Sequence, residues 1–385
     1  MVLKRKVLIH ATIYTGESEE PIKDGFIRFS EKIAEVGEMK FYKEEQDEEV
    51  IDGTGRIVIP GMIDVHIHGG HGLDVMDANP DKLLYLSEKL LEEGVTSYFA
   101  TTITQDPNDI EAALKAVKVA KDKGASIEGV HLEGPYISEK RAGAQPYEFI
   151  TDPNIEQFLQ WYEASGDLIK LVTYAPERPG GAEFEKVMLE RGIVPSVGHS
   201  DAVRAELLDS KASHATHLYN GMRGLHHREA GVAGHALLTD GLQVEVIADG
   251  IHITPDMINL AYRLKGAEGI TLISDAMRAK GMVEGEYELG GQKVWVKDGQ
   301  ARLEDDTLAG SVLKMDEAFR NIITYTGCSV GEAVQMTSGN QAREFGLDQK
   351  GILAPGKDAD LVILNKQYEV EKTYRLGKGN ILEGK

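Results

Sequence analysis

A repeating pattern of strands and helices begins in the sequence at Arg56-Ile57-Val58-Ile59-Pro60-Gly61-Met62-Ile63-Asp64-Val65-His66-Ile67-His68. From there, apolar runs rich in β-branched residues alternate with polar loops and stretches of helical spacing. The runs cover residues 63–65, 96–101, 127–132, 168–174, 194–197, 215–218, 244–248 and 270–273. Eight strands alternating with helices over about 220 residues predict one parallel (β/α)8 TIM-like barrel.

An open, doubly wound sheet is the alternative fold for this alternation. Its first strand would lead into a glycine-rich phosphate-binding turn, but His66-Ile67-His68 occupies that position here. β-prone runs also lie at both ends of the chain. We therefore predict a catalytic barrel at 58–346 with a β-hairpin insert near 283–305. The segments 1–57 and 347–385 are predicted to form a small β-sandwich domain.

The composition indicates an acidic cytoplasmic protein. The 385 residues carry a formal net charge of −21, which repels nucleic acids and anionic membranes, and we find no concentrated basic patch. Cys328 is the only cysteine, so a reducing compartment is expected. No stretch approaches the roughly 20 apolar residues of a membrane span. We predict neither a nucleic-acid nor a membrane partner.

Histidine and carboxylate side chains follow the predicted strands. They are His66 and His68 after the first strand, Glu133 after the third, His199 after the fifth, His217 in the sixth and Asp275 after the eighth. A lone histidine near a strand end is usually a packed or surface residue. In a barrel, however, these strand ends converge on the face where active sites form. Imidazole and carboxylate are typical zinc or iron ligands, so the set predicts a divalent metal site.

Longer motifs resemble those of the amidohydrolase superfamily. The opening motif at 60–69 resembles that of many amidohydrolases. His131-Leu132-Glu133-Gly134-Pro135 and Thr216-His217-Leu218-Tyr219-Asn220 are more specific, and resemble the N-acetylglucosamine-6-phosphate deacetylase branch. Matching segments follow in order over essentially the whole chain. The resemblance implies hydrolysis of N-acetyl-D-glucosamine 6-phosphate to D-glucosamine 6-phosphate and acetate, a step of amino-sugar metabolism.

The resemblance also implies roles for the residues around the metal. Glu133, His199 and His217 would be the common metal ligands. His66 and His68 would hold a second ion with Glu133 as a bridge, so one or two ions are expected. Asp275 would be the catalytic residue that takes a proton from the metal-activated water and passes it to the leaving amine.

Further matching segments imply substrate contacts. His252 would bind the 6-phosphate together with Arg228 from the neighbouring subunit of a homodimer. The segments expected to contact the sugar contain Asn220, Gly221, Leu308, Ala309 and Gly310. Beside Ala144, the chain departs from the family at Gln145, where many members carry a histidine that helps polarise the substrate carbonyl. Both residues are expected to contact substrate, but a glutamine cannot carry charge.

Two alternatives keep the sequence pattern and change the function. One is an amidohydrolase acting on a related acylated amino sugar or a cyclic amide. Cyclic amidases usually need a bridging lysine on the fourth strand, and residues 171–176 contain none. The other is a metal-free scaffold descended from such an enzyme. Such a scaffold would lose its metal-ligating residues first, whereas this sequence has a histidine or carboxylate at every expected ligand position.

Overall fold

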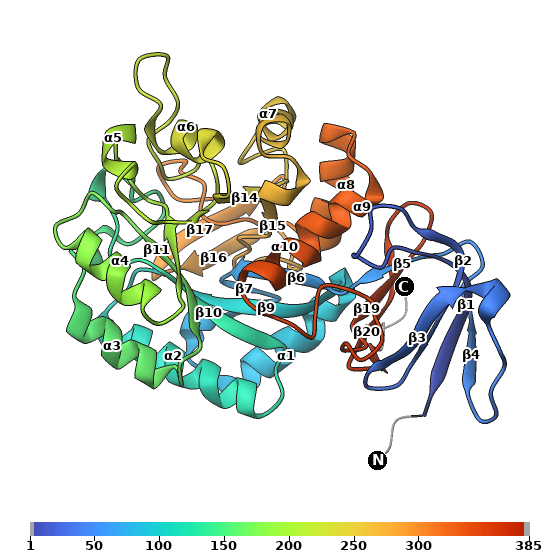
Figure 1. Cartoon of the computed structure of the whole chain (residues 1–385). Coiled ribbons are helices and arrows are strands. Elements are labelled where there is room, and N and C mark those ends of the chain that lie inside the picture. The colour runs from blue at the N-terminus through green and yellow to red at the C-terminus, as the bar shows by residue number, and fades with distance from the viewer. Residues whose placement is uncertain (1–3, 381–385) are drawn as a thin grey trace. The chain divides into compact units, whose positions relative to one another are not determined.

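The computed structural model describes residues 4–380 and divides the chain into two compact units (Figure 1). Among the described residues, the first unit combines 4–64 with Ser87–Ser97 and 315–380. The second unit consists of Val65–Leu86 and Tyr98–Lys314. Each unit is described by itself below.

Eight strands form the predicted barrel. Their order in the sheet is β6, β9, β10, β11, β12, β13, β14 and β15, and strands from β9 onward pair in parallel. They are β6 Met62–Ile67, β9 Val95–Thr102, β10 Ile127–Glu133, β11 Ile169–Tyr174, β12 Val194–Val197, β13 His214–Ala215, β14 Gln243–Ile247 and β15 Ile270–Ile273. A parallel bridge between Ile67 and Ala276 links the first and last strands. The (β/α)8 prediction is confirmed.

Helices follow the barrel strands: α1 Pro80–Leu90, α2 Pro107–Asp122, α3 Ile155–Ala164, α4 Gly181–Leu189, α5 Arg204–Leu207, α6 Gly231–Leu238 and α7 Pro255–Lys265. Helix α2 shows why they form: the side chain of Asp106 accepts a hydrogen bond from the backbone N–H of Asn108, and Pro107 occupies the first turn. Figure 1 shows α2, α3 and α4 outside the strands. Among residues 4–380, no helix has the length and hydropathy of a membrane span.

Strands from both ends of the chain form one mixed sheet, in the order β21, β20, β19, β5, β1, β2 and β3, with β4 also paired to β1. They are β1 Lys6–Ile13, β2 Ile22–Phe29, β3 Ile33–Glu38, β4 Glu49–Asp52, β5 Ile57–Pro60, β19 Leu361–Leu364, β20 Val370–Arg375 and β21 Lys378–Gly379. Buried Leu8, Phe29, Leu361 and Tyr374 belong to its core. The sheet from both chain ends was expected. Residues 1–3 and 381–385 of the predicted domain lie outside the described residues.

Helices of the first unit follow the barrel in sequence. They are α8 Met315–Thr326, α9 Val330–Val334 and α10 Asn340–Glu344, with a π-helical turn at Gln335–Gly339 between the last two. A 3-10 turn at Met39–Phe41 lies in the charged segment after β3.

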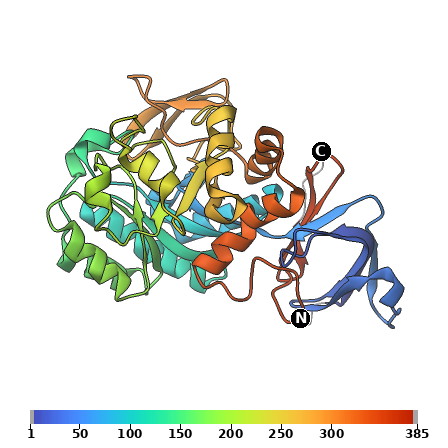
Figure 2. The ribbon, with the colours of Figure 1, turned by 45° about the horizontal axis from the view of Figure 1, so that its top comes forward.

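A separate three-stranded sheet belongs to the second unit. It consists of β16 Gly285–Leu289, β17 Gln292–Lys297 and β18 Gln300–Arg302, joined by tight turns at Gly290-Gly291 and Asp298-Gly299. All four turn residues have positive φ, which glycine and aspartate tolerate best. Its buried side chains pack with Ile103, Met277 and Ala309. Figure 2 shows this sheet, coloured orange, as a layer apart from the barrel strands.

Candidate metal centre

Six buried side chains meet at the carboxyl ends of the barrel strands. His66 is in β6 and His68 follows it, Glu133 ends β10, and His199, His217 and Asp275 follow β12, β13 and β15. The last three have φ angles of 45°, 30° and 48°. This left-handed backbone is unfavourable for residues with a Cβ, so the surrounding structure must hold it. Such strain is concentrated at functional sites.

The first cluster joins Glu133, His199 and His217. Oε1 of Glu133 lies 3.2 Å from Nε2 of His199 and 3.0 Å from Nε2 of His217. The two Nε2 atoms are 3.1 Å apart. Ligands of a tetrahedral zinc ion with bonds near 2.1 Å lie about 3.4 Å from one another. The three donor atoms therefore have nearly the spacing of one face of a tetrahedral metal site.

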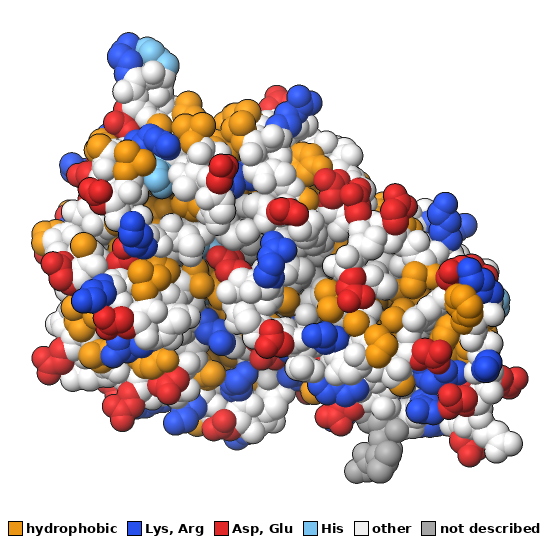
Figure 3. Space-filling view, viewed as in Figure 1, with side chains coloured by type: hydrophobic (Ala, Val, Ile, Leu, Met, Phe, Trp, Pro, Cys, Tyr) orange, Lys and Arg blue, Asp and Glu red, His pale blue; other side chains and the backbone are white. Residues whose placement is uncertain are grey.

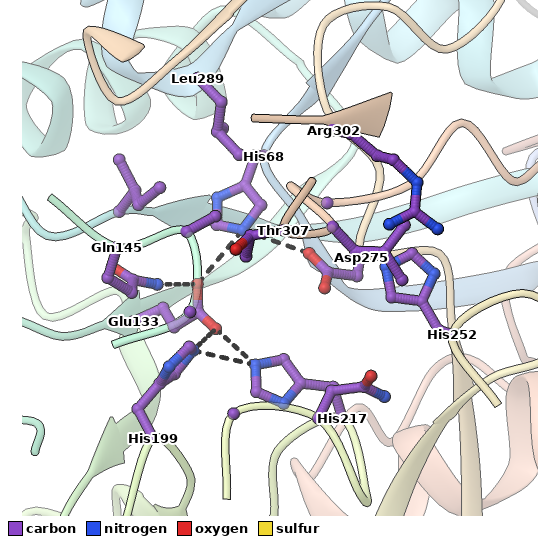
Figure 4. Close-up of a pocket in the computed structure, with 17 residues that line it drawn as sticks. His68, Glu133, Gln145, His199, His217, His252, Asp275, Leu289, Arg302 and Thr307 are labelled. Atoms are coloured by element: carbon purple, nitrogen blue, oxygen red, sulfur yellow. Dashed lines mark hydrogen bonds and ion pairs between the residues drawn. The ribbon is translucent and has the colours of Figure 1, made fainter. Parts of the chain in front are cut away.

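The second cluster joins His66, His68 and Asp275. Nε2 of each histidine lies 3.3 Å from Oδ1 of Asp275. Oε2 of Glu133 lies 3.2 Å from Nε2 of His68, so the two oxygens of this carboxylate face different clusters. Figure 4 shows Glu133 between His68 on one side and the pair His199 and His217 on the other. Glu133 has the placement required of a bridging ligand.

The charges of the two clusters depend on one another. Burial disfavours the charged ring of His68, but hydrogen bonds to Asp275 and Glu133 outweigh burial and raise its pKa to about 9. Burial also opposes ionisation of Glu133, yet the neighbouring His66, His199 and His217 hold the pKa of this carboxyl well below its usual value. A bound metal ion would replace these protons as the positive charge between the histidine rings and the ionised carboxylates.

A pocket of about 340 Å³ opens onto both clusters. It is lined by His68, Glu133, Ala144, Gln145, His199, His217, Asn220, Gly221, His252, Asp275, Leu308 and Gly310, all predicted site residues. His66 and Ala309 are fully buried and do not line it. Arg228 also lies outside the pocket: it is exposed on the loop before α6, with its guanidinium 2.7 Å from Nε2 of His227. Within its own chain, Arg228 does not reach the site.

Comparison with known proteins shows the family of this chain. Residues 57–381 match the model of the Amidohydrolase family. The N-acetylglucosamine-6-phosphate deacetylase of Bacillus subtilis is 46% identical over 94% of this chain and 93% of its own length. The chain belongs to the amidohydrolase family. The resemblance drawn from the sequence motifs to its N-acetylglucosamine-6-phosphate deacetylase branch is confirmed.

Two further relatives extend the comparison of this amidohydrolase. The N-acetylgalactosamine-6-phosphate deacetylase of Escherichia coli O157:H7 is 37% identical over 86% of this chain and 89% of its own. A mutant N-acetyl-D-glucosamine-6-phosphate deacetylase from Mycobacterium smegmatis, solved in complex with N-acetyl-D-glucosamine-6-phosphate, superposes with a TM-score of 0.92. It is 30% identical, and the match covers 98% of this chain and 100% of that one.

Glu245, in β14 of this amidohydrolase, is a site residue that the sequence analysis missed. Its buried carboxylate lies 2.9 Å from Nδ1 of His66 and 3.2 Å from Nε2 of His214. It also accepts a hydrogen bond of 3.0 Å from the backbone N–H of His217. Burial opposes its ionisation, but His66 and His214 hold the pKa of Glu245 well below its usual value. A carboxylate in an otherwise apolar strand was the signal that could have revealed it.

Both the nitrogen and the oxygen of the Gln145 side-chain amide form hydrogen bonds. Nε2 donates to Oε2 of Glu133 at 2.8 Å, and Oε1 accepts from the backbone N–H of Thr104 at 2.8 Å. These two bonds fix which end of the amide faces Glu133. Gln145 therefore lines the pocket, as substrate contact requires, and also orients the carboxylate between the two clusters.

His252 is likewise held in place. Its Nδ1 lies 2.7 Å from Oδ2 of Asp249, whose other oxygen accepts the backbone N–H groups of Ile251 and His252. With Nδ1 paired to Asp249, Nε2 is the ring nitrogen left for a ligand in the pocket.

Proposed function

We propose that the chain hydrolyses the N-acetyl group of N-acetyl-D-glucosamine 6-phosphate, giving D-glucosamine 6-phosphate and acetate. The observation that carries this proposal is the pocket itself. It joins the clusters around Glu133 to Asn220, His252 and Leu308, in segments that match those expected to contact the phosphorylated sugar. The names of the curated relatives support the same substrate.

We propose that one or two divalent ions, zinc or iron, occupy the clusters. Glu133, His199 and His217 would hold the first ion, and His66, His68 and Asp275 with Glu133 the second. A divalent ion in such a site lowers the pKa of water and polarises an amide carbonyl. The nitrogen and carboxylate donors suit both metals.

Asp275 would be the catalytic acid and base. It lines the pocket, and although burial opposes its ionisation, the neighbouring His66 and His68 keep its pKa below the usual value. The ionised carboxylate can therefore accept a proton from the attacking water. As the carbon–nitrogen bond breaks, Asp275 returns that proton to the leaving amine, and the water oxygen stays on the acetate.

Recognition of the phosphate would involve His252 and the Arg228 of a second copy of the chain. Between β13 and α6 a yellow-green loop projects from the barrel in Figure 1, and Figure 3 shows positive and histidine side chains at its tip. Leu225 on this loop, Leu238 at the end of α6 and Leu264 on α7 are exposed by more than half. An arginine that does not reach the pocket of its own chain, on a loop that also exposes Leu225, supports a homodimer.

A second candidate substrate is N-acetylgalactosamine 6-phosphate. The 37% identical Escherichia coli relative supports it, because that relative bears the name of a deacetylase for the galactosamine sugar. The two sugars differ only at one hydroxyl group, so their deacetylation uses the same chemistry. A cytoplasmic location, inferred from the single buried Cys328, belongs to the same proposal.

The test measures acetate release from both phosphorylated sugars and from unphosphorylated N-acetylglucosamine, with metal content and molar mass determined on the same sample. Bound metal with highest kcat/KM on N-acetylglucosamine 6-phosphate is the expected result. Preference for the galactosamine sugar would favour the second candidate. Bound metal with no deacetylation of any of these sugars would refute the proposal, and a monomeric mass would refute the dimer.

A further inference from the structure

We infer that Arg302 is a specificity-determining residue that binds the phosphate group of the substrate from within the same chain. The inference rests on the proposed function for the identity of the phosphorylated sugar. Arg302 lines the pocket, and among the described residues that do so it is the one arginine or lysine. Glu133 and Asp275 place two carboxylates in the same pocket, in a chain of net charge −21. An anionic substrate needs a cation to offset this charge.

The backbone holds Arg302 next to the segment expected to contact the sugar. Arg302 ends β18 and forms an antiparallel bridge with Leu308, which also lines the pocket. Hydrogen bonds on both sides fix this register: the N–H of Leu303 donates to the carbonyl of Thr307 at 2.8 Å, and the N–H of Ala309 to that of Ala301 at 2.9 Å. The position of Arg302 is thus set by strand pairing.

The guanidinium of Arg302 is oriented by Gln300 and by Asp306, whose exposed carboxylate lies 3.6 Å from Nε. Nε and Nη2 donate to Oε1 of Gln300 at 2.9 and 2.7 Å, and Nη1 donates to the carbonyl of Asp306. A guanidinium has five N–H groups, so these hydrogen bonds use three of them. The others have no hydrogen-bond partner among the described residues. Two N–H groups on a planar, permanently charged fork suit phosphate oxygens better than the flexible ammonium of lysine does.

Figure 4 shows where this guanidinium lies. The side chains of Arg302 and His252 are on one side of the pocket, and Gln145 is on the other. His252 is the residue of this chain already proposed to bind the phosphate. An anion beside His252 would therefore lie on the same side of the pocket as Arg302, away from the Gln145 side of the metal centre.

Phosphate binding by Arg228 would then require the dimer, whereas phosphate binding by Arg302 would not. Arg228 is exposed on a loop and outside the pocket of its own chain, so it requires a second copy. Arg302 is part of the pocket of a single chain. Phosphate recognition by Arg302 would not change with protein concentration, whereas the contribution of Arg228 would disappear when the dimer dissociates.

The experiment compares wild type with R302A, R302K and the control K293A. Lys293 is an exposed residue of the neighbouring β17, pairs with Glu286 and does not line the pocket. Calorimetry gives the affinity of each protein for glucosamine 6-phosphate and for glucosamine, so binding is measured without turnover. Acetate release from N-acetylglucosamine 6-phosphate is measured on the same samples, and melting temperatures check folding.

R302A is expected to weaken glucosamine 6-phosphate binding by about 10- to 100-fold, the range of a charged hydrogen bond. Binding of glucosamine should not change, R302K should recover part of the affinity, and K293A should match wild type. Unchanged glucosamine 6-phosphate binding by a folded R302A would overturn the inference, and so would an equal loss for both ligands. If wild type releases no acetate while R302A still loses only phosphate-dependent binding, the proposed function fails and the role of Arg302 stands.

Discussion

Nδ1 of His66 lies 2.9 Å from a carboxylate oxygen of Glu245. The Nε2 atom of the same ring faces the second cluster, 3.3 Å from Asp275. Glu245 therefore stabilises the tautomer that carries its proton on Nδ1, which leaves the lone pair of Nε2 for a metal. The hydrogen bond from the backbone N–H of His217 to Glu245 joins this carboxylate to the first cluster as well.

E245Q should weaken metal binding while the chain stays folded. The amide has nearly the same shape but no charge, and loss of such a supporting carboxylate typically lowers metal affinity about 10- to 100-fold. Metal content per chain, measured during titration with a chelator, checks this.

The matched control for E245Q is E185Q. Glu185 is also buried and bonds Tyr174 and Ser210, but it is not part of the candidate metal clusters. Equal metal retention by E245Q, E185Q and wild type would contradict the positioning role of Glu245.

D275N should remove most of the activity without preventing substrate binding. An amide cannot accept the proton of the attacking water, and the loss of a general base typically lowers kcat by about 100- to 10,000-fold. At least one metal per chain should remain, because Glu133, His199 and His217 are unchanged. Single-turnover rates with metal analysis test this, and a D275N protein within tenfold of wild type would exclude the acid–base role.

Q145A should lower both stability and kcat. The substitution leaves the backbone N–H of Thr104 without its acceptor and removes one of the donors to Glu133, a loss of about 1–3 kcal/mol for buried groups. Q145H restores a donor of the kind many relatives carry, so it should retain more activity than Q145A. The measurements are urea unfolding and kcat, and a Q145A protein equal to wild type in both would show that these bonds are unimportant.

The ion pair between Arg28 and Glu48 should make the stability of the first unit decrease at low pH. Their side chains are only 3% and 1% exposed, and the hydrogen bond from Arg28 lowers the pKa of Glu48 below its ordinary value of 4.5. Since the folded state holds the depressed pKa, this stabilisation is fully present above about pH 4.5 and is lost as the pH falls through the folded pKa.

E48Q should therefore reduce the free energy of unfolding by about 1–3 kcal/mol at pH 7. The difference from wild type should shrink in urea titrations below pH 4.5. A difference that stays constant across that range would mean that the charge of Glu48 is not responsible.

Much of the barrel could be predicted from the sequence, because buried parallel strands appear as continuous apolar runs. The predicted strands 194–197 and 270–273 coincide with β12 and β15. The helical segment that begins with α9 is less predictable. It changes to a π-helical turn at Gln335 and continues as α10 to Glu344. Apolar spacing alone does not reveal a change in hydrogen-bond register.

The site was only partly predictable for a similar reason. Histidines and carboxylates at strand ends are visible in a sequence, so the six side chains of the two clusters could be named. Glu245 is in the middle of a strand and Arg302 in the hairpin insert, and their roles depend on which residues face them across space. Those neighbours are set by barrel closure and strand pairing, which sequence distance does not show.

The mixed sheet has a consequence for synthesis of the chain. Strand β5 pairs with β1 on one edge and with β19 on the other, and β19 is encoded about 300 residues later. At ribosomal speeds of about 5–20 residues per second, the edge of β5 waits roughly 15–60 s for its partner. Until β19 is synthesised, this edge of the apolar segment Ile57–Pro60 lacks its strand partner. Chaperone capture at the ribosome should concentrate on this edge and end when β19 emerges.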